Sequence, residues 1–585
     1  MAEAQRISTL AVGGVSRAAI YVDALVEKAL TKAWPSYVLI LLLQSKVIWR
    51  IWEIRDITYG DTSSYFESAK KWADGFLVDI VWSPLYTAFY GSFLFVTADP
   101  YNVTIMHRVV IVLAAAVGVL FVLRQLLSPS LALLGAAWWA ILSINYNTLY
   151  EVHLFALLPI LVVWALVLGR DSAWARGAGF AILATSGVLV RNEFLVAAVV
   201  MLLLCIAHER RRWKKVTTFA PAYGIPLVAG VTLCGLAYWR SVIKLPEIWP
   251  HLEAKHTLNM CQVYAFGYQQ RHPEWTASPW IECQALAHST FGLDYPSIGQ
   301  MLWSNPIATL THFWWNLGLA PNGLEALLFN ARAGSFDPDY APTHVATYPL
   351  ILGALVIALL TGGAILAWRA RSKTPLWWIN RAAIAFLPLL AMAVPVVLTQ
   401  RPRPSYFFYV SVIVIAATMG AIAIMLRRWP GICRTLDIGA LTLASALILS
   451  LPRYSLPPYL LSGRPVLQKL EHLAPHRAAL LKTQGRVILG HWASEVASYL
   501  DLNSIEGPRT AFDNTLLRNW DGMSPLDQYL AEQRVDILYL DPGELAWLRA
   551  QPQAKNMLDN PRAAGWLTLA HEERSDGNWA LLAKM

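Results

Sequence analysis

Carboxylates and arginines recur at the ends of the hydrophobic segments of this sequence. Asp61 stands in YGDTSSYFESAKKWADG, directly after the first hydrophobic segment, and Glu151 follows the third. Arg191 lies between two short apolar segments in LVRNEFL, and Arg403 precedes a late one in QRPRPSYFF. A carboxylate can deprotonate a nucleophile, and guanidinium groups can hold an anionic leaving group. Around one cavity, these residues would suit sugar transfer from a lipid-linked phosphosugar.

The composition predicts a polytopic membrane protein. The chain has 585 residues, of which 56% are hydrophobic and only 15% are charged. Apolar windows of about 18 or more residues, long enough to cross roughly 30 Å of hydrocarbon, recur between residues 34 and 452. The net charge of +9 does not indicate nucleic acid, because Lys and Arg concentrate in short loops between these windows.

Eleven membrane spans are predicted. Their approximate ranges are 34–54, 103–124, 130–149, 152–170, 177–191, 193–207, 217–240, 346–367, 382–399, 405–426 and 437–452. This number places the basic loops HERRRWKK, RARSK and RRWPGICR on one face, which the positive-inside rule makes cytoplasmic. Residues 1–33 are predicted to form a cytoplasmic amphipathic segment, without a cleavable signal peptide.

The opposite face is predicted to receive three polar regions. They are an outer loop over 55–102 with helices lying along the interface, an outer insert over 241–345, and everything after residue 452. The apolar run WSPLYTAFYGSFLFVTA belongs to the first region, because counting it as a span would reverse every later loop. The apolar runs GRVILGHW, RVDILYLD and NWALLAKM are predicted to be short buried strands. Amphipathic runs lie between them, so residues 453–585 are predicted to form a small extracytoplasmic α/β domain.

The insert contains two cysteines and several histidines. Cys261 and Cys283 could form a disulfide in an oxidising compartment, or each could remain a buried free thiol. The histidines lack tight metal-ligand spacing, and Asp337-Pro338-Asp339 is more typical of a proline turn than of a metal motif. No cofactor is assigned, and a divalent metal ion remains an option.

Ionisable residues also lie within or between the predicted spans. Lys46 and Arg50 fall in the outer half of the first span, where they either serve function or extend to the lipid headgroups. About 14 apolar residues flank Arg191 and Glu193 on each side, which gives about 21 Å of helix per side. The apex of this pair is therefore predicted to be buried, where Arg191 needs an anion, either Glu193 or a ligand.

The order of these motifs resembles the GT-C superfamily of polytopic glycosyltransferases. That group includes protein O-mannosyltransferases, the lipid A aminoarabinose transferase and bacterial arabinofuranosyltransferases. The resemblance covers roughly residues 35–426 and rests on five elements in order. They are GDxxxYxxxA after the first span, the PLY segment, an acidic residue after the third span, a short helical pair with a basic apex, and an R-x-x-Y turn before a late span.

The resemblance implies a bacterial inner-membrane enzyme with its active site and carboxy-terminal domain on the extracytoplasmic side. It would move a sugar from a polyprenyl-phosphate donor to a cell-envelope glycan, lipid or protein. Asp61 resembles the catalytic base, Glu151 the second acidic motif, and Arg191 and Arg403 the groups that hold the donor phosphate. The further substrate-binding candidates are Lys46, Arg50, Asp56, Tyr65, Tyr86, His153, Glu193, Arg401 and Tyr406. Many relatives have two adjacent acids where this chain has Gly60-Asp61, so the metal is left unknown.

Alternatives remain open at the level of residues and of function. Asp61 could cap the helix that follows it, Glu151 could be a solvated turn residue, and Arg403 could anchor at the rim. A flippase or transporter for lipid-linked saccharides is one alternative function, although no internal repeat is evident in the sequence. A polymerase or ligase of lipid-linked glycans is another, because its donor would attract the same arginines.

Overall fold

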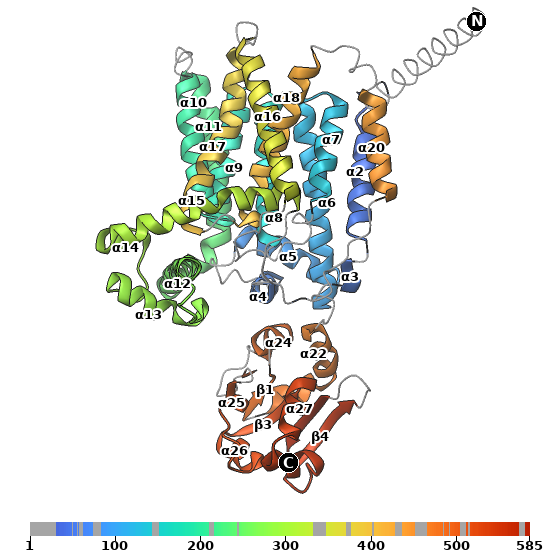
Figure 1. The fold of residues 1–585 in the computed structure, drawn as a ribbon, viewed down its shortest axis with the longest axis vertical. Coiled ribbons are helices and arrows are strands. Elements are labelled where there is room, and N and C mark those ends of the chain that lie inside the picture. The colour runs from blue at the N-terminus through green and yellow to red at the C-terminus, as the bar shows by residue number, and fades with distance from the viewer. Residues whose placement is uncertain are drawn as a thin grey trace, which may run out of the picture. The chain divides into compact units, whose positions relative to one another are not determined.

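A computed structural model gives the fold of the chain (Figure 1). The residues that it describes are 28, 31–49, 51–54, 57, 62–73, 83–142, 151–209, 216–242, 245–330, 347–369, 376–400, 403–427, 436–450, 465–483, 485–490, 492–502, 511–512, 515–572 and 579–585. They fall into two compact units. The first unit takes the described residues of Met1–Arg50, Phe76–Tyr86 and His107–Tyr454, and the second those of Ile51–Gly75, Thr87–Met106 and Ser455–Met585.

Long apolar helices dominate the first unit. Six of the described helical stretches are long and apolar enough to cross a membrane: α6 (Pro100–Leu126), α8 (Glu151–Gly169), Ala220–Ala237 of α11 (Val216–Val242), α16 (Thr347–Arg369), Arg381–Gln400 of α17 (Leu376–Gln400), and Pro404–Leu426, which joins η6 (Pro404–Phe407) to α18 (Phe408–Leu426). Helices satisfy their own backbone hydrogen bonds, as hydrocarbon requires. The chain is therefore a multi-pass α-helical membrane protein.

Each of the other five predicted spans contains a shorter helix. These helices are α2 (Trp34–Val47), α7 (Pro129–Ala140), α9 (Ala173–Leu189), α10 (Phe194–Glu209) and α20 (Leu436–Ser450). They have between 12 and 17 residues, fewer than the about 20 that a crossing normally needs. Length and hydropathy thus support six crossings, and the total of eleven stays a prediction. Within the segment predicted to lie along the interface, the described residues form the nine-residue α5 (Pro84–Ser92) and η2 (Phe93–Phe95).

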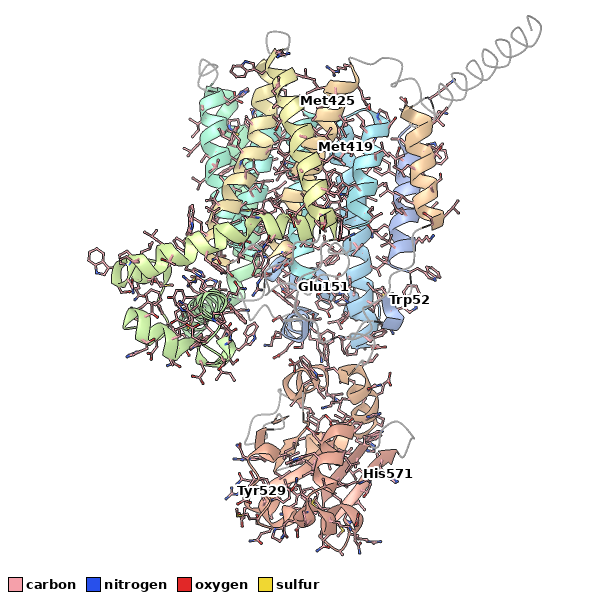
Figure 2. All side chains as sticks on the ribbon, viewed as in Figure 1. Trp52, Glu151, Met419, Met425, Tyr529 and His571 are labelled. Carbon is pink, nitrogen blue, oxygen red and sulfur yellow. The ribbon has the colours of Figure 1, made fainter. Side chains whose placement is uncertain are left out.

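Helices α8 and α18 run in the same direction through the bundle. Figure 2 labels Glu151, where α8 begins, at one end of the bundle, and Met425, where α18 finishes, near the other. The chain leaves α10, α16 and α18 at the Met425 end, and the three predicted basic loops follow those helices. The loops themselves lie outside the described residues. Which end faces the cytoplasm stays a prediction.

The insert after α11 forms four further helices of the first unit. They are α12 (Leu245–Arg271), α13 (Pro279–Phe291), α14 (Ile298–Ser304) and α15 (Pro306–Phe329). Local signals set their ends: Ser297 and Gln300 form a capping box at α14, and the Asn305 side chain accepts a hydrogen bond from the Ala308 amide at 3.0 Å. Gly292, with φ of 72°, ends α13 in the left-handed conformation.

Cys261 and Cys283 lie in contact in the core between α12 and α13. Both are free thiols with 2% of their surface exposed, and their side chains are hydrogen-bonded to each other. Burial raises the pKa of both thiols, which keeps the reactive thiolate scarce near neutral pH.

We expect glutathione disulfide to join these two cysteines slowly, each bridge reducing one glutathione disulfide to two glutathione molecules. Closing a loop of about 20 residues should stabilise the fold by about 3 kcal/mol. Peptide mapping under non-reducing conditions should find the 261–283 cross-link, and the oxidised protein should unfold at a higher temperature. Cys283→Ser is the control, because it removes both effects. A linked peptide without a rise in unfolding temperature would contradict the stabilisation.

The second unit contains a five-stranded mixed sheet. Its strands are β1 (Arg486–Ile488), β2 (Ala511–Phe512), β3 (Val535–Leu540), β4 (Trp566–Glu572) and β5 (Trp579–Lys584). The order is β2-β1-β3-β5-β4, with β1 parallel to β2 and β3, and β5 antiparallel to β3 and β4. The helices of this region are α22 (Pro465–Leu473), η7 (Ala474–His476), α23 (Arg477–Lys482), α24 (Ala493–Tyr499), α25 (Thr515–Arg518), α26 (Leu526–Glu532), α27 (Pro542–Arg549) and α28 (Pro552–Asp559). The predicted α/β architecture is confirmed, and β2 and β4 are additional to the sequence prediction.

Part of the predicted outer loop is built into this second unit. Its helices α3 (Ile51–Ile54) and α4 (Thr62–Ala73) precede α5 in the chain. The Phe66 ring lies between the rings of Tyr90 and Tyr499, at 5.9 and 5.0 Å between centroids. The Tyr499 hydroxyl donates to the Ile57 carbonyl at 2.6 Å, and Lys70 pairs with Asp501. Aromatic and polar contacts therefore join α4 to the carboxy-terminal sheet region.

Candidate functional site

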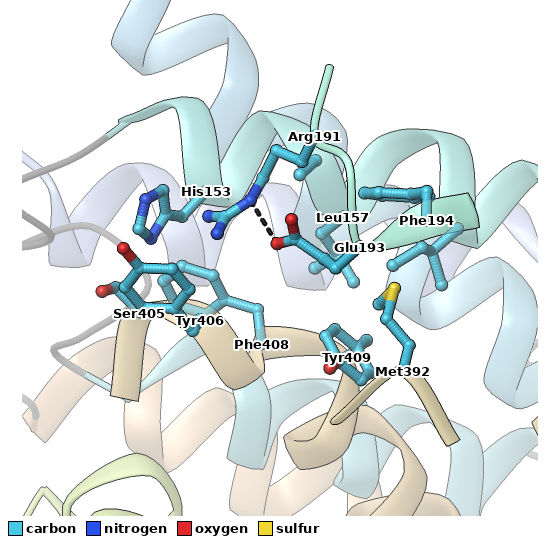
Figure 3. Close-up of a pocket in the computed structure, with 12 residues that line it drawn as sticks. His153, Leu157, Arg191, Glu193, Phe194, Met392, Ser405, Tyr406, Phe408 and Tyr409 are labelled. Atoms are coloured by element: carbon cyan, nitrogen blue, oxygen red, sulfur yellow. Dashed lines mark ion pairs between the residues drawn. The ribbon is translucent and has the colours of Figure 1, made fainter. Parts of the chain in front are cut away.

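One small pocket of the first unit collects several of the predicted residues (Figure 3). The residues that line it are His153, Ala156, Leu157, Ile160, Arg191, Glu193, Phe194, Met392, Ser405, Tyr406, Phe408 and Tyr409. The cavity between these side chains holds about 10 Å³, which is the space of about one water molecule. A phosphate group would therefore enter only as lining side chains such as Glu193 move, and a lipid chain has no room.

The turn between α9 and α10 carries Arg191 and Glu193 into this pocket. The backbone N–H groups of Val190 and Arg191 both donate to the Ser186 carbonyl at 2.9 Å, which closes the end of α9. The two helices pack closely at Gly187, where an added Cβ would come within 2.6 Å of the Leu195 side chain. Arg191 and Glu193 form an ion pair with side chains 15% and 22% exposed. Both side chains are half-buried and Asn192 between them is exposed, so the apex is less buried than its length predicted.

Two arginines from distant segments meet at one aromatic ring. The guanidinium carbon of Arg191 lies 4.3 Å from the centroid of the Tyr406 ring, and that of Arg403 lies 5.8 Å from it. The His153 ring meets the same ring edge-on at 4.3 Å, and the backbone of Ser405 hydrogen-bonds His153. Tyr406 belongs to η6, which Pro404 begins directly after Arg403. Cation–π contacts of this kind hold guanidinium groups in place in a partly dry site.

Two buried hydroxyl groups also line the pocket. Ser405 is 1% exposed and Tyr409 is 5% exposed. Neither hydroxyl oxygen has a hydrogen-bond partner among the residues that the structure describes. A buried hydroxyl without a partner costs about 1–3 kcal/mol, so these two groups would favour a water molecule or a polar ligand group in the pocket.

A second polar cluster occupies another face of α8. Glu151 forms an ion pair with Arg108 of α6, and the two side chains are 4% and 2% exposed. Beside them, the Tyr86 hydroxyl lies 3.0 Å from Nε2 of His107, and the Tyr86 ring lies 5.4 Å from that of Phe155. Glu151 is thus buried, and the interpretation as a solvated turn residue is wrong.

Arg108 and His107 are absent from the sequence prediction. The signal for them was present, because a consecutive His-Arg pair interrupts the long apolar helix α6, and ionisable residues inside a membrane segment are functional or structural by default. Their role was not predicted because Arg108 pairs with Glu151, which is 43 residues away, and such a distant pair leaves no local sequence pattern.

The structure describes some of the remaining predicted site residues and leaves others outside its described ranges. The Lys46 ammonium donates to the Ile448 carbonyl in the last turn of α20, which is a structural role near a helix carboxyl end. Tyr65 lies in α4 of the second unit. The predicted residues that lie outside the described part of the chain are Arg50, Asp56, Asp61 and Arg401.

Within the described ranges, no group of three or more His, Cys, Asp or Glu side chains is placed to hold a metal ion. Asp337 and Asp339 lie outside those ranges. Neither a protein-family model nor a curated protein sequence matches this chain. The resemblance to a glycosyltransferase superfamily therefore rests on the order of its motifs.

Proposed function

We propose that this chain is a membrane glycosyltransferase of the bacterial inner membrane. It would transfer a sugar from a polyprenyl-phosphate donor to an extracytoplasmic acceptor, with Asp61 as the general base. The observation that carries the proposal is the meeting of Arg191 and Arg403 on the Tyr406 ring, at one end of a bundle of membrane helices. Two guanidinium groups at the end of such a bundle suit the phosphate of a lipid.

The chemistry of the pocket supports a phosphate as its ligand. A guanidinium group matches two oxygens of a phosphate, and the interaction strengthens where water is scarce. The hydroxyls of Ser405 and Tyr409 can donate to further oxygens, which would satisfy both groups. Binding would exchange Glu193 for a phosphate oxygen on Arg191, while the polyprenyl chain stays in the surrounding lipid.

In the proposed reaction the acceptor hydroxyl oxygen bonds to the anomeric carbon of the sugar. Asp61 takes the proton of that hydroxyl as the bond between the anomeric carbon and the phosphate oxygen breaks. The electron pair of the broken bond leaves with polyprenyl phosphate. Arg191 and Arg403 stabilise the charge that develops on this leaving group.

Removing Arg191 tests the phosphate assignment. Arg191→Ala should weaken binding of a polyprenyl-phosphate sugar about 10- to 150-fold, because a hydrogen bond to a charged group contributes about 1.5–3 kcal/mol. Donor affinity can be measured with purified protein in nanodiscs, across a panel of polyprenyl-phosphate sugars. Arg427→Ala is the matched control, since it removes an exposed guanidinium at the far end of α18 and should leave affinity unchanged.

The double variant Arg191→Ala/Glu193→Gln separates phosphate binding from folding. It removes the Arg191 cation without leaving the Glu193 carboxylate unpaired. If this double variant folds, its donor affinity should be as low as that of Arg191→Ala. Unaltered donor affinity in both variants would remove Arg191 from the phosphate site. Release of free polyprenyl phosphate distinguishes the enzyme from a flippase, which would bind the same donor and release none.

A further inference from the structure

An exposed apolar stripe runs along α14 and α15. Trp303, Ile307, Leu310 and Trp314 are 92%, 78%, 57% and 76% exposed, and Leu317 continues the row. Ile307, Leu310, Trp314 and Leu317 recur at intervals of three and four along α15, so they lie on one face of that helix. Trp303 precedes them at the end of α14. Contiguous apolar surface of this kind is rare on protein that faces water and marks an interaction site.

The opposite face of α15 is fixed against the bundle. Thr309, His312 and Asn316 are fully buried there. The Asn316 amide donates to the Leu398 carbonyl of α17 at 2.7 Å, and the His312 ring lies 3.1 Å from the Asn316 amide nitrogen. Since these contacts set the rotation of α15 about its axis, the stripe must point away from α17.

The direction of α15 differs from that of the membrane helices. Figure 1 shows α15 running across the direction of α16 and α18, from α14 at the side of the bundle towards the bundle itself. It is not among the six described stretches apolar enough to cross a membrane. Because the membrane helices cross the bilayer, the direction of α15 is that of a helix lying in the plane of the membrane surface.

We propose that the stripe on α14 and α15 is buried in the interface of the lipid bilayer. Residues 295–324 contain no Asp, Glu, Lys or Arg, so no charge opposes insertion over this whole length. Trp303 and Trp314 stand at the two ends of the most exposed part, and Trp prefers the level of the lipid headgroups. Helix α15 packs against α16, α17 and α18, which are apolar and long enough to cross a membrane, so lipid lies close to it. The inference does not depend on sugar transfer.

Photo-crosslinking in nanodiscs tests this placement. Benzoylphenylalanine is introduced singly at Trp303, Trp314 and Leu310 of the full chain, in nanodiscs of phosphatidylethanolamine and phosphatidylglycerol. Glu282 is the control position, because it is an exposed charged residue on the neighbouring α13. After irradiation, mass spectrometry should find phospholipid adducts at the three stripe positions and none at Glu282.

Other outcomes would overturn the placement. Adducts with a second copy of this chain would make the stripe a protein interface. Lipid adducts at Glu282 as frequent as those at the stripe would mean that the stripe has no preference for the bilayer, and an absence of lipid adducts at all three positions would place the stripe in water. Because all three side chains are exposed, each variant should keep its fold, which gel filtration checks before irradiation.

Discussion

Asp61→Asn is expected to reduce sugar transfer by about 10²–10⁴-fold, the usual contribution of a general base. Donor binding should stay close to that of the unchanged protein, because the asparagine keeps the shape and loses only the proton acceptor. The measurement is release of polyprenyl phosphate from the donor in the presence of acceptor, alongside donor affinity in nanodiscs.

The same substitution separates the catalytic role from a capping role. Asp61 precedes Thr62, the first described residue of α4, and the sequence leaves an N-cap role for Asp61 open. Asparagine is as good an N-cap as aspartate, so Asp61→Asn preserves a cap and removes a base. If turnover is unchanged, Asp61 is not the base.

Asp99→Asn is the matched control for this experiment. Asp99 belongs to the same predicted outer loop and accepts hydrogen bonds from the Tyr101 amide at 2.9 Å and from the Asn102 side chain at 2.7 Å. An asparagine can keep one of these bonds through its single side-chain oxygen, and the other donor can bond to water because the site is exposed. Turnover of this variant should match that of the unchanged protein, and an equal loss in both variants would indicate damage to the loop rather than to a base.

Breaking the Arg108–Glu151 pair is expected to give the largest change in stability. Both side chains are almost fully buried, so Arg108→Met would leave the Glu151 carboxylate without its cation inside the bundle. Removing one partner of a buried pair costs about 3–5 kcal/mol in the free energy of unfolding. Glu151→Met should cost a similar amount. Thermal unfolding in one detergent measures both variants.

The double variant Arg108→Met/Glu151→Met should recover most of this loss, because two apolar side chains replace two charges and neither is left unpaired. The exposed pair of Lys71 and Glu67, at 3.4 Å with both side chains 39% exposed, gives the comparison. Lys71→Met should change stability by less than about 1 kcal/mol. A double variant that is less stable than either single variant would mean that the pair stabilises the fold beyond mutual neutralisation.

Local sequence patterns predicted those features that depend on interactions between neighbouring residues. The hydrophobic windows predicted a helix in every one of eleven segments, because the backbone must satisfy its own hydrogen bonds in hydrocarbon. The short pair around Arg191 and Glu193 was predicted from its length alone to have a buried apex, and the structure shows both side chains half-buried. Local patterns also predicted the strands β1, β3 and β5, which are compact apolar runs.

Features that depend on residues far apart in the sequence were not predicted. The strands β2 and β4 gain their hydrogen bonds from β1 and β5, and β2 has only two residues of its own. The predicted outer loop packs with the carboxy-terminal region through Phe66 and Tyr499, a contact that composition does not encode. The insert was predicted only as a polar outer region, whereas α15 has one face fixed on α17 and the other exposed.

The sequence by itself determined that this is a helical membrane protein, which polar residues lie at the ends of its apolar segments, and that a small α/β region follows them. It could do so because hydrophobicity and helix length act over neighbouring residues. Only the tertiary structure decided that Arg191 and Arg403 share the Tyr406 ring and that Glu151 belongs to Arg108. Such pairings depend on how each helix is rotated and packed, and packing is a property of the whole bundle.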